Sequence, residues 1–254
     1  ILIVNDASNH DRATEEKKFK NIQSIKILNM IKNQGHARCI ATGLKYLFEK
    51  DDFEYVIPMD GDGEDRPEEI RDFLSKIENS NNKPIVGERV KRSEDLKFKI
   101  CYVLHKVFTL VFTGQLIKFG NFTCLPKSVV EKMINEKATW NSFSGSLKKI
   151  ERNLVSIPSV RGKRYFGPSK MSFYNLIKHS LSIISVFRKT FLIRSALFII
   201  LYILLIKSYA SVITAIPIIC LLVAVYLISN LSLRENLDEF KNSLKQIKNI
   251  DIIQ

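Results

Sequence analysis

The sequence predicts an α/β protein: a mostly parallel, doubly wound sheet with helices on both faces, followed by a two-helix membrane hairpin. Three observations indicate this. Short apolar runs alternate with amphipathic segments, acidic residues follow the apolar runs, and residues 191–231 carry almost no charge. The 254 residues have a formal net charge of +13, yet the mean hydropathy is zero. Very apolar segments must therefore offset a hydrophilic, basic remainder.

The composition excludes several classes of protein. Intrinsic disorder needs low hydrophobicity, whereas 46% of these residues are apolar. With 10 Gly and 4 Cys, the chain is neither collagen-like nor a disulfide framework. The Cys residues form no CxxC pair and the four His residues are scattered, so we expect neither a zinc site nor a His-based triad. We expect no nucleic-acid binding, because the basic residues flank apolar segments and no binding module is present.

Strands and helices alternate through the first 90 residues. Apolar, β-branched runs predict strands at residues 1–4, 24–30, 55–59 and 84–87. Amphipathic or charged segments predict helices at residues 12–21, 37–50 and 67–77. This βαβαβ order predicts the mostly parallel sheet. Because the chain begins inside a strand and without Met, we expect one further strand and its loop to precede residue 1.

Ligands of such sheets bind beyond the carboxyl ends of the strands, where Asp6, Gly35, Asp60 and Asp62 fall. In extended backbone, residues i and i+2 point to the same side. The carboxylates of Asp60 and Asp62, separated by Gly61, can therefore share a hard cation, Mg²⁺ or Mn²⁺. A solvated acidic turn is the alternative.

Two roles stay open for the next two acidic residues, Glu64 and Asp65. They support the proposed metal site, or they cap the following helix near its positive end.

The apolar segments predict the membrane hairpin. Lys207 is the only charged residue between Arg194 and Arg234, and it divides two apolar runs. The second run has the length of about 20 residues that a membrane helix needs. The first reaches that length if it begins near Phe191 and Arg194 snorkels to the interface. A buried helical hairpin of a soluble core is the alternative. Because Lys and Arg flank the outer ends, we expect the domain and both termini to be cytoplasmic.

Six motifs of the chain, in order, resemble those of one family. IVNDAS resembles a strand-end DDGS element, NQGHARCIATGL an N-x-G-x-x-x-A-x-x-x-G-L element, and MDGDGEDRPEEI the metal motif DADLQDPPE. GERVKR, GNFTCLPKSVV and RYFGPSKM resemble G-x-R-x-x-R, G-D/N-F-x-x-x and R-x-x-G-x-S-K. With the hairpin, they resemble an inverting family 2 glycosyltransferase of GT-A fold. The branch is that of dolichol-phosphate mannose synthase and bacterial polyprenyl-phosphate glycosyltransferases.

The resemblance implies a metal-dependent, inverting transfer of sugar from a UDP- or GDP-sugar to polyprenyl phosphate or a related lipid-linked acceptor. It implies Mg²⁺ or Mn²⁺ on Asp60 and Asp62. The implied catalytic residues are Asp60, Asp62 and Arg89. The implied nucleotide-sugar contacts are Asp6, Ser8, Asn33, Gly35, Asp60, Gly61 and Asp62. The implied ligands of the acceptor phosphate are Arg92, Arg164, Ser169 and Lys170.

The chain departs from the family motifs at Asn5, Ala7, Glu64 and Asn121. Asn121 stands where an Asp is frequent and cannot act as a general base, which weighs against a sugar-hydroxyl acceptor. A phosphate monoester is already anionic near neutral pH, and metal stabilisation of the leaving diphosphate can then carry most of the catalysis. Asn121 therefore favours a lipid phosphate. A glycan hydroxyl as acceptor, and a non-catalytic scaffold of the same fold, remain alternatives.

The remaining segments also suit work at a membrane. Residues 96–112 and 172–187 mix basic with large apolar residues, as interfacial helices do; core helices are the alternative. The basic cluster near Arg161 and Arg164 suits anionic head groups. The predicted organisation is a GT-A domain over residues 1–170, an interfacial helix over 171–190, two membrane helices over 191–231 and a charged, amphipathic cytoplasmic tail over 232–254. Helical spacing of apolar residues in the tail suits self-association.

Overall fold

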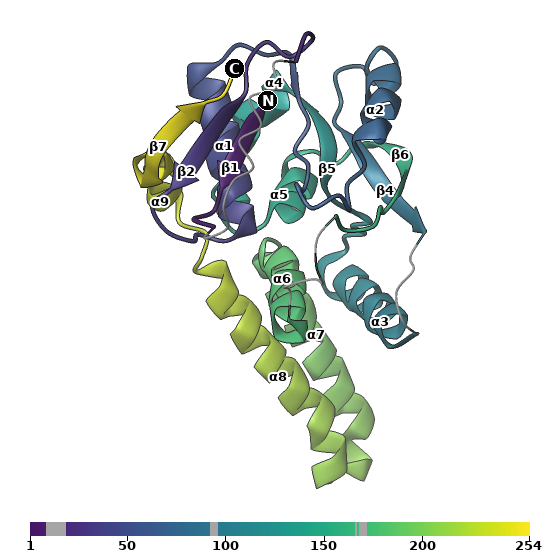
Figure 1. Cartoon of the computed structure of the whole chain (residues 1–254). Helices are drawn as coiled ribbons and strands as arrows, with labels where there is room; N and C mark the ends of the chain where they lie inside the picture. The colour runs from purple at the N-terminus through teal and green to yellow at the C-terminus, as the bar shows by residue number, and fades with distance from the viewer. Residues whose placement is uncertain (9–18, 92–95, 166, 168–171) are drawn as a thin grey trace.

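The computed structural model describes the chain except residues 9–18, 92–95, 166 and 168–171. In the described part, a mixed α/β body carries two long helices that project from it side by side (Figure 1). Both chain ends lie in the body. The Ile25 amide donates to the Gln254 carbonyl at 2.8 Å, and the Lys26 amide donates to the Ile1 carbonyl at 3.0 Å. The segment after the second long helix thus returns to the body.

The first sheet has the strand order β1-β2-β7. Strand β1 (Leu2–Asn5) is parallel to β2 (Lys26–Met30), and both lie where strands are predicted. Strand β7 (Ile247–Ile252) pairs with β2 in the antiparallel sense.

The second sheet has the order β3-β5-β4-β6. Strands β3 (Tyr55–Val56) and β4 (Ile85–Lys91) flank β5 (Phe119–Pro126) as antiparallel neighbours, and β6 (Val155–Val160) is parallel to β4. Both sheets are therefore mixed, and the prediction of a mostly parallel sheet is wrong. The reason is that β5 and β7, which no periodicity argument had assigned, insert antiparallel to the predicted strands.

Helices cover both faces of the second sheet, as predicted. Helices α1 (His36–Lys50), α4 (Lys127–Asn135) and α5 (Phe143–Ile150) pack on one face. Helix α2 (Ile70–Ile77), preceded by a 3-10 turn at Pro67–Glu69, packs on the other.

Neighbouring residues of the strands enter these two cores in turn, as the period of a strand requires. Val86 and Leu125 face α1, α4 and α5, whereas Ile85 and Cys124 face α2. On the α2 side, Phe73 meets Phe122 edge to face at 4.8 Å. The helix predicted over residues 12–21 lies mostly outside the described residues.

The projecting hairpin consists of α7 (Arg188–Ile206) and α8 (Val212–Ser232), joined by a turn at Lys207–Tyr209. Both helices are long and apolar enough to cross a membrane by length and composition. Ser211 and Thr214 form a capping box at the start of α8, which accommodates Pro217 in its interior. Most outward side chains of the hairpin are exposed apolar ones, for example Leu201 at 59% and Leu205 at 70%.

Helices α3 (Leu96–Thr113) and α6 (Phe173–Ser185) lie where the hairpin meets the body (Figure 1). Phe112, Ile184 and Phe191 join them to the hairpin in one apolar cluster. Arg194 of α7, for which the sequence predicts snorkelling, donates to the carbonyls of Leu110 and Val111 at the end of α3, at 3.3 and 2.7 Å.

Residues 232–254 do not form the predicted amphipathic helix. Helix α9 (Leu237–Lys241) is short and leads through a 3-10 turn at Ser243–Gln246 into β7. Phe240 is fully buried and stacks on Trp140, with ring centroids 5.4 Å apart and 17° between the planes. The helical prediction fails here because the apolar residues of the segment find partners on β2 and Trp140, which local spacing does not reveal.

Candidate active site

Asp6 follows β1 and is tied to the loop that follows β2. Its Oδ1 accepts a hydrogen bond from the Gln34 amide at 2.6 Å, and its Oδ2 accepts one from the Gly35 amide at 2.9 Å. Asn33 donates from its side chain to the Asp6 carbonyl at 3.2 Å. Gly35 has φ = 89°, a conformation that favours glycine. Asp6, Asn33 and Gly35, which are predicted to contact the nucleotide sugar, therefore meet at one sheet edge. Ser8, predicted for the same role, donates its amide hydrogen to the Asn5 side chain nearby.

Asp60 lies beyond β3 and faces this loop. Its Oδ1 is 2.9 Å from Nε2 of His36. Burial opposes ionisation of Asp60, but the hydrogen bond from His36 and the charges of His36 and Arg89 outweigh it, so its pKa lies below the ordinary value. Asp60 is therefore ionised at neutral pH, as a metal ligand must be.

His36 is a site residue that the sequence reading missed. It is the first residue of α1, and its hydrogen bond to Asp60 raises its pKa against the opposing effect of burial. The side-chain nitrogen of Asn121 lies 3.4 Å from both ring nitrogens. The signal that points to His36 is its place directly after Gly35, in the loop that also holds Asp6.

Asp62 is held by the segment that follows β6. Its Oδ2 forms an ion pair with Arg164 at 2.7 Å, and its carbonyl accepts from the Tyr165 amide at 3.0 Å. Glu64 pairs with Arg161 and, at 3.3 Å, with Arg164. The basic segment 161–165 thus closes over the acidic turn 60–65.

Two glycines permit this approach of two backbones. A Cβ atom on Gly162 would lie 2.4 Å from the carbonyl oxygen of Gly63, closer than real Cβ atoms come. Gly63 itself has φ = 88°, and a Cβ there would meet the Tyr165 ring at 2.8 Å. Larger residues at either position would separate the basic segment from the acidic turn.

Glu64 and Asp65, for which the sequence leaves two roles open, both contact other residues of the site. The Asp65 carboxylate accepts from the Asp60 amide at 2.9 Å, and Glu64 forms the ion pairs just described. The 3-10 helix at Pro67–Glu69 has no side-chain cap. Burial raises the pKa of Asp65 to about 6. The hydrogen bond from the Asp60 amide opposes this shift, whereas the negative charge of Asp60 adds to it. Both residues therefore support the acidic turn.

The basic residues predicted for the site are only partly described. Arg89 on β4 packs close to Gly120, and its charge lowers the pKa of Asp60. Arg164 contacts Asp62, as above. Arg92, Ser169 and Lys170 lie outside the described residues, so their predicted roles stay predictions.

The carboxylates of Asp60 and Asp62 fit a divalent cation by the chemistry of their donors. Mg²⁺ takes one or two carboxylates and completes its shell with water and substrate phosphates. Among the residues that the structure describes, no three His, Cys, Asp or Glu side chains form a metal-binding group. A cation here would thus depend on oxygens supplied by a substrate, and it would compete with His36 and Arg164 for the two aspartates.

An apolar groove of about 480 Å³ lies between α3 and α6, beside the hairpin. Its walls include Phe108, Val111 and Phe112 from α3, and Leu181 and Ile184 from α6. The two helices that the sequence predicts at a membrane interface therefore form a joint apolar surface.

Comparison with known proteins adds three similarities. Residues 1–137 match the model of the family described as Glycosyl transferase family 2. Over 192 residues, the chain is 26% identical to undecaprenyl-phosphate 4-deoxy-4-formamido-L-arabinose transferase of Klebsiella pneumoniae, covering 70% of this chain and 54% of that protein. Over 129 residues, it is 26% identical to an uncharacterised protein of Methanocaldococcus jannaschii, covering 48% and 56%. The chain spans about half the length of the curated relatives it matches.

Proposed function

The chain belongs to glycosyl transferase family 2, and from this premise we propose that it transfers a sugar from a nucleotide sugar to polyprenyl phosphate at a membrane. The observation that carries the proposal is the meeting of the acidic turn 60–65 with the basic segment 161–165, in a protein that also has an apolar groove between α3 and α6. The acidic turn suits a metal-bound diphosphate and the basic segment suits a phosphate. The apolar groove suits an isoprenoid chain. The Klebsiella relative, by its name, uses undecaprenyl phosphate.

On the donor side, Asp6 and the loop after β2 would hold the nucleoside. Asp60 and Asp62 would hold the diphosphate through Mg²⁺ or Mn²⁺, which would neutralise charge on the leaving group. Arg164 pairs with Asp62 in the structure. We propose that it turns to a substrate phosphate once Asp62 serves the cation, because a guanidinium pairs with phosphate in a bidentate manner.

In the transfer itself, a phosphate oxygen of the acceptor would form a bond to the anomeric carbon. The bond from that carbon to the diphosphate oxygen would break on the opposite face, and the electron pair would leave with the nucleoside diphosphate. This displacement inverts the anomeric centre. The acceptor enters as an anion, so Asn121 beside His36 need not remove a proton.

The membrane part of the proposal rests on the two apolar helices of the hairpin. We propose that α7 and α8 span the bilayer, with the turn at Lys207–Tyr209 on the far side and the body and both described ends in the cytoplasm. Basic residues support this orientation, since Arg188, Lys189 and Arg234 flank the body side of the hairpin. Helices α3 and α6 would then lie at the cytoplasmic interface.

A transfer assay tests the function. Membranes that contain the protein are given labelled UDP- and GDP-sugars with polyprenyl phosphate, and the lipid product is identified. Formation of a sugar-phosphate lipid supports the proposal. Transfer only to a glycan hydroxyl would replace the acceptor. If the protein neither transfers sugar nor binds a nucleotide sugar, the result favours the non-catalytic scaffold. The departures at Asn5, Ala7 and Asn121 point to that alternative.

A further inference from the structure

We propose that the segment after the hairpin is a positioning element for donor binding. The segment comprises residues 236–254 and is called the brace; the loop it holds, residues 31–35, is called the donor loop. The inference rests on the proposed function, because it assigns the brace to the donor side of that site. The matched family model ends at residue 137, so the brace lies beyond it.

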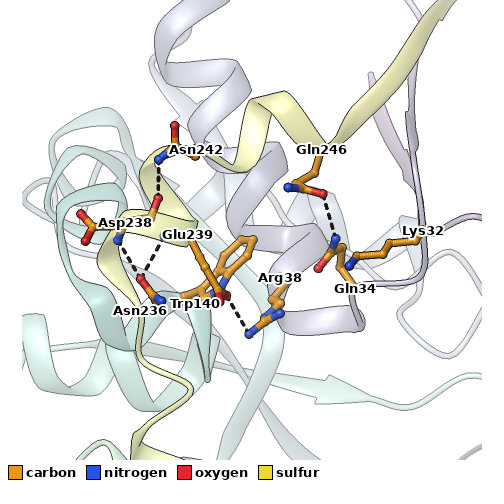
Figure 2. Close-up of a pocket in the computed structure, with 9 residues that line it drawn as sticks. All are labelled: Lys32, Gln34, Arg38, Trp140, Asn236, Asp238, Glu239, Asn242 and Gln246. Atoms are coloured by element: carbon orange, nitrogen blue, oxygen red, sulfur yellow. Dashed lines mark hydrogen bonds and ion pairs between the residues drawn. The ribbon is translucent and has the colours of Figure 1, made fainter.

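Gln246 connects the brace to the donor loop at two points. Its carbonyl accepts a hydrogen bond from the Ile31 amide at 2.8 Å. Its side-chain oxygen accepts one from the Gln34 side chain at 3.3 Å (Figure 2). The backbone amide of Gln34 in turn donates to Asp6. One residue of the brace thus holds the start and the end of the loop whose amides hold Asp6.

Glu239 connects the brace to the first turn of α1. Its Oε2 accepts from the Trp140 indole at 2.9 Å and pairs with Arg38 at 3.1 Å, and Figure 2 shows the three side chains together. The Arg38 guanidinium also lies 4.9 Å from the centre of the Trp140 ring. The Nε atom of Arg38 is buried without a hydrogen-bond partner among the described residues, so Glu239 dominates the polar contacts of Arg38. Arg38 is two residues from His36, the partner of Asp60.

The contact between the brace and the donor side has a packed part, where Phe240 stacks on Trp140, and an open part. The open part is a cavity of about 400 Å³, lined among others by Lys32, Gln34 and Arg38 on one side and Asn242 and Gln246 on the other (Figure 2). Substitution of a polar side chain at this cavity leaves the packed core intact. We therefore expect such changes to shift the donor loop more than they lower the stability of the fold.

The brace also begins close to the hairpin. Helix α8 ends at Ser232, and Ser232 accepts a hydrogen bond from Arg188 at the start of α7 at 3.2 Å. Four residues later the brace begins. The position of the donor loop is thereby linked to the base of the two apolar helices.

Substitution of Gln246 tests the brace, with Gln254 as the matched control. Gln254 is a second amide of the brace, but it bonds to Phe19 and Ile22, away from the donor loop. We expect Gln246→Ala to raise the KM for the nucleotide sugar about 2- to 10-fold, the size of one lost hydrogen bond. The kcat and the KM for polyprenyl phosphate stay unchanged, and Gln254→Ala leaves all three constants unchanged.

The Arg38–Glu239 pair gives a test by rescue. Arg38→Glu and Glu239→Arg each raise the donor KM, and the double variant restores it at least in part. If the charge-reversed variants fail to fold, Glu239→Gln removes only the charge. We expect it to raise the KM for the nucleotide sugar and to leave kcat and the KM for polyprenyl phosphate unchanged. An unchanged donor KM in Gln246→Ala and Glu239→Gln would overturn the inference, as would equal losses of kcat and melting temperature in Gln246→Ala and Gln254→Ala.

Failure of the proposed function would be seen separately, as absence of sugar transfer by the wild-type protein. In that case the brace is tested by calorimetric titration of the same variants with UDP and GDP. Weaker binding by Gln246→Ala but not by Gln254→Ala supports the brace, and equal affinities overturn it.

Discussion

Arg194 provides a sharp test of how helix α3 is held against the hairpin. Its guanidinium donates to the Leu110 and Val111 carbonyls in the last turn of α3, where the Leu110 carbonyl also accepts from the Gly114 amide at 2.8 Å. Gly114, with φ = 72°, ends the helix in the left-handed conformation common at this position. The Arg194 charge also faces the negative end of the helix dipole. Arg194→Ala removes both hydrogen bonds and the charge at the end of α3 at once, while the Leu110 carbonyl keeps its bond from the Gly114 amide.

The magnitude follows from the contacts. A hydrogen bond to a charged group contributes about 1.5–3 kcal/mol when it is buried. The Arg194 side chain is exposed on the surface of the protein. Screening at the surface reduces the contribution of its hydrogen bonds to about 1 kcal/mol or less. The helix dipole adds about 0.3–1 kcal/mol. The sum of about 0.5–2 kcal/mol corresponds to a change of roughly 2- to 30-fold in the equilibrium constant for docking of α3 on the hairpin.

The assay is the KM for polyprenyl phosphate of long chain, measured beside a short-chain analogue. Because α3 forms one wall of the apolar groove, we expect Arg194→Ala to raise the KM for the long-chain acceptor about 3- to 10-fold. The KM for the short-chain acceptor and for the donor should change little. Arg188→Ala is the matched control, since Arg188 lies on the same helix, carries the same charge and contacts Ser232 instead of α3. Equal effects of the two variants, or equal effects on both acceptors, would refute the reasoning.

Three further predictions concern the acidic turn, its glycine contact and the half-buried His105. Asp60→Ala and Asp62→Ala should each lower sugar transfer by at least about 100-fold, and full activity of the double variant with Mg²⁺ or Mn²⁺ would remove the metal role. Gly162→Ala should lower the melting temperature by several degrees, because its Cβ meets backbone at 2.4 Å, whereas Gly61→Ala, with open space around it, should not. Burial lowers the pKa of His105, so below about pH 6.5 the unfolded chain binds a proton that the folded protein does not, and the free energy of unfolding falls. Scanning calorimetry from pH 7.5 to 5.5 should therefore show a smaller fall in melting temperature for His105→Gln than for the wild-type protein.

The parts of the fold that the sequence predicts are those set by neighbouring residues. An apolar, β-branched run followed directly by an acid identifies β1 with Asp6 and β3 with Asp60, and each acid lies beyond the carboxyl end of its own strand. The amphipathic spacing after Gly35 predicts α1 almost to the residue. Such signals need no knowledge of distant partners, which is why they are legible in one sequence.

The parts that it does not predict depend on pairing between distant residues. Strand β7 pairs with β2 across more than 200 residues, and its own pattern of charged and apolar residues suits a surface helix equally well. The contact of His36 with Asp60 and the ion pair of Arg164 with Asp62 join residues that are 24 and about 100 positions apart. Sequence alone places each of these residues at a loop, but only the folded chain decides which of them touch.

The ion pairs of the site explain how an acidic turn persists in a protein of net charge +13. Asp60, Asp62 and Glu64 lie within five residues of one another, and their mutual repulsion would open the turn unless cations balance it. His36 balances the first, Arg164 the second, and Arg161 together with Arg164 the third. In the proposed function, a divalent cation would add two positive charges to the same turn and would take over part of this compensation from His36 and Arg164. The basic segment, in part released, would then be free to pair with a phosphate; in the chain it precedes α6, which is one wall of the apolar groove, and the hairpin. The same residues thus stabilise the acidic turn and, in the proposed function, would favour the entry of an acceptor once they are displaced.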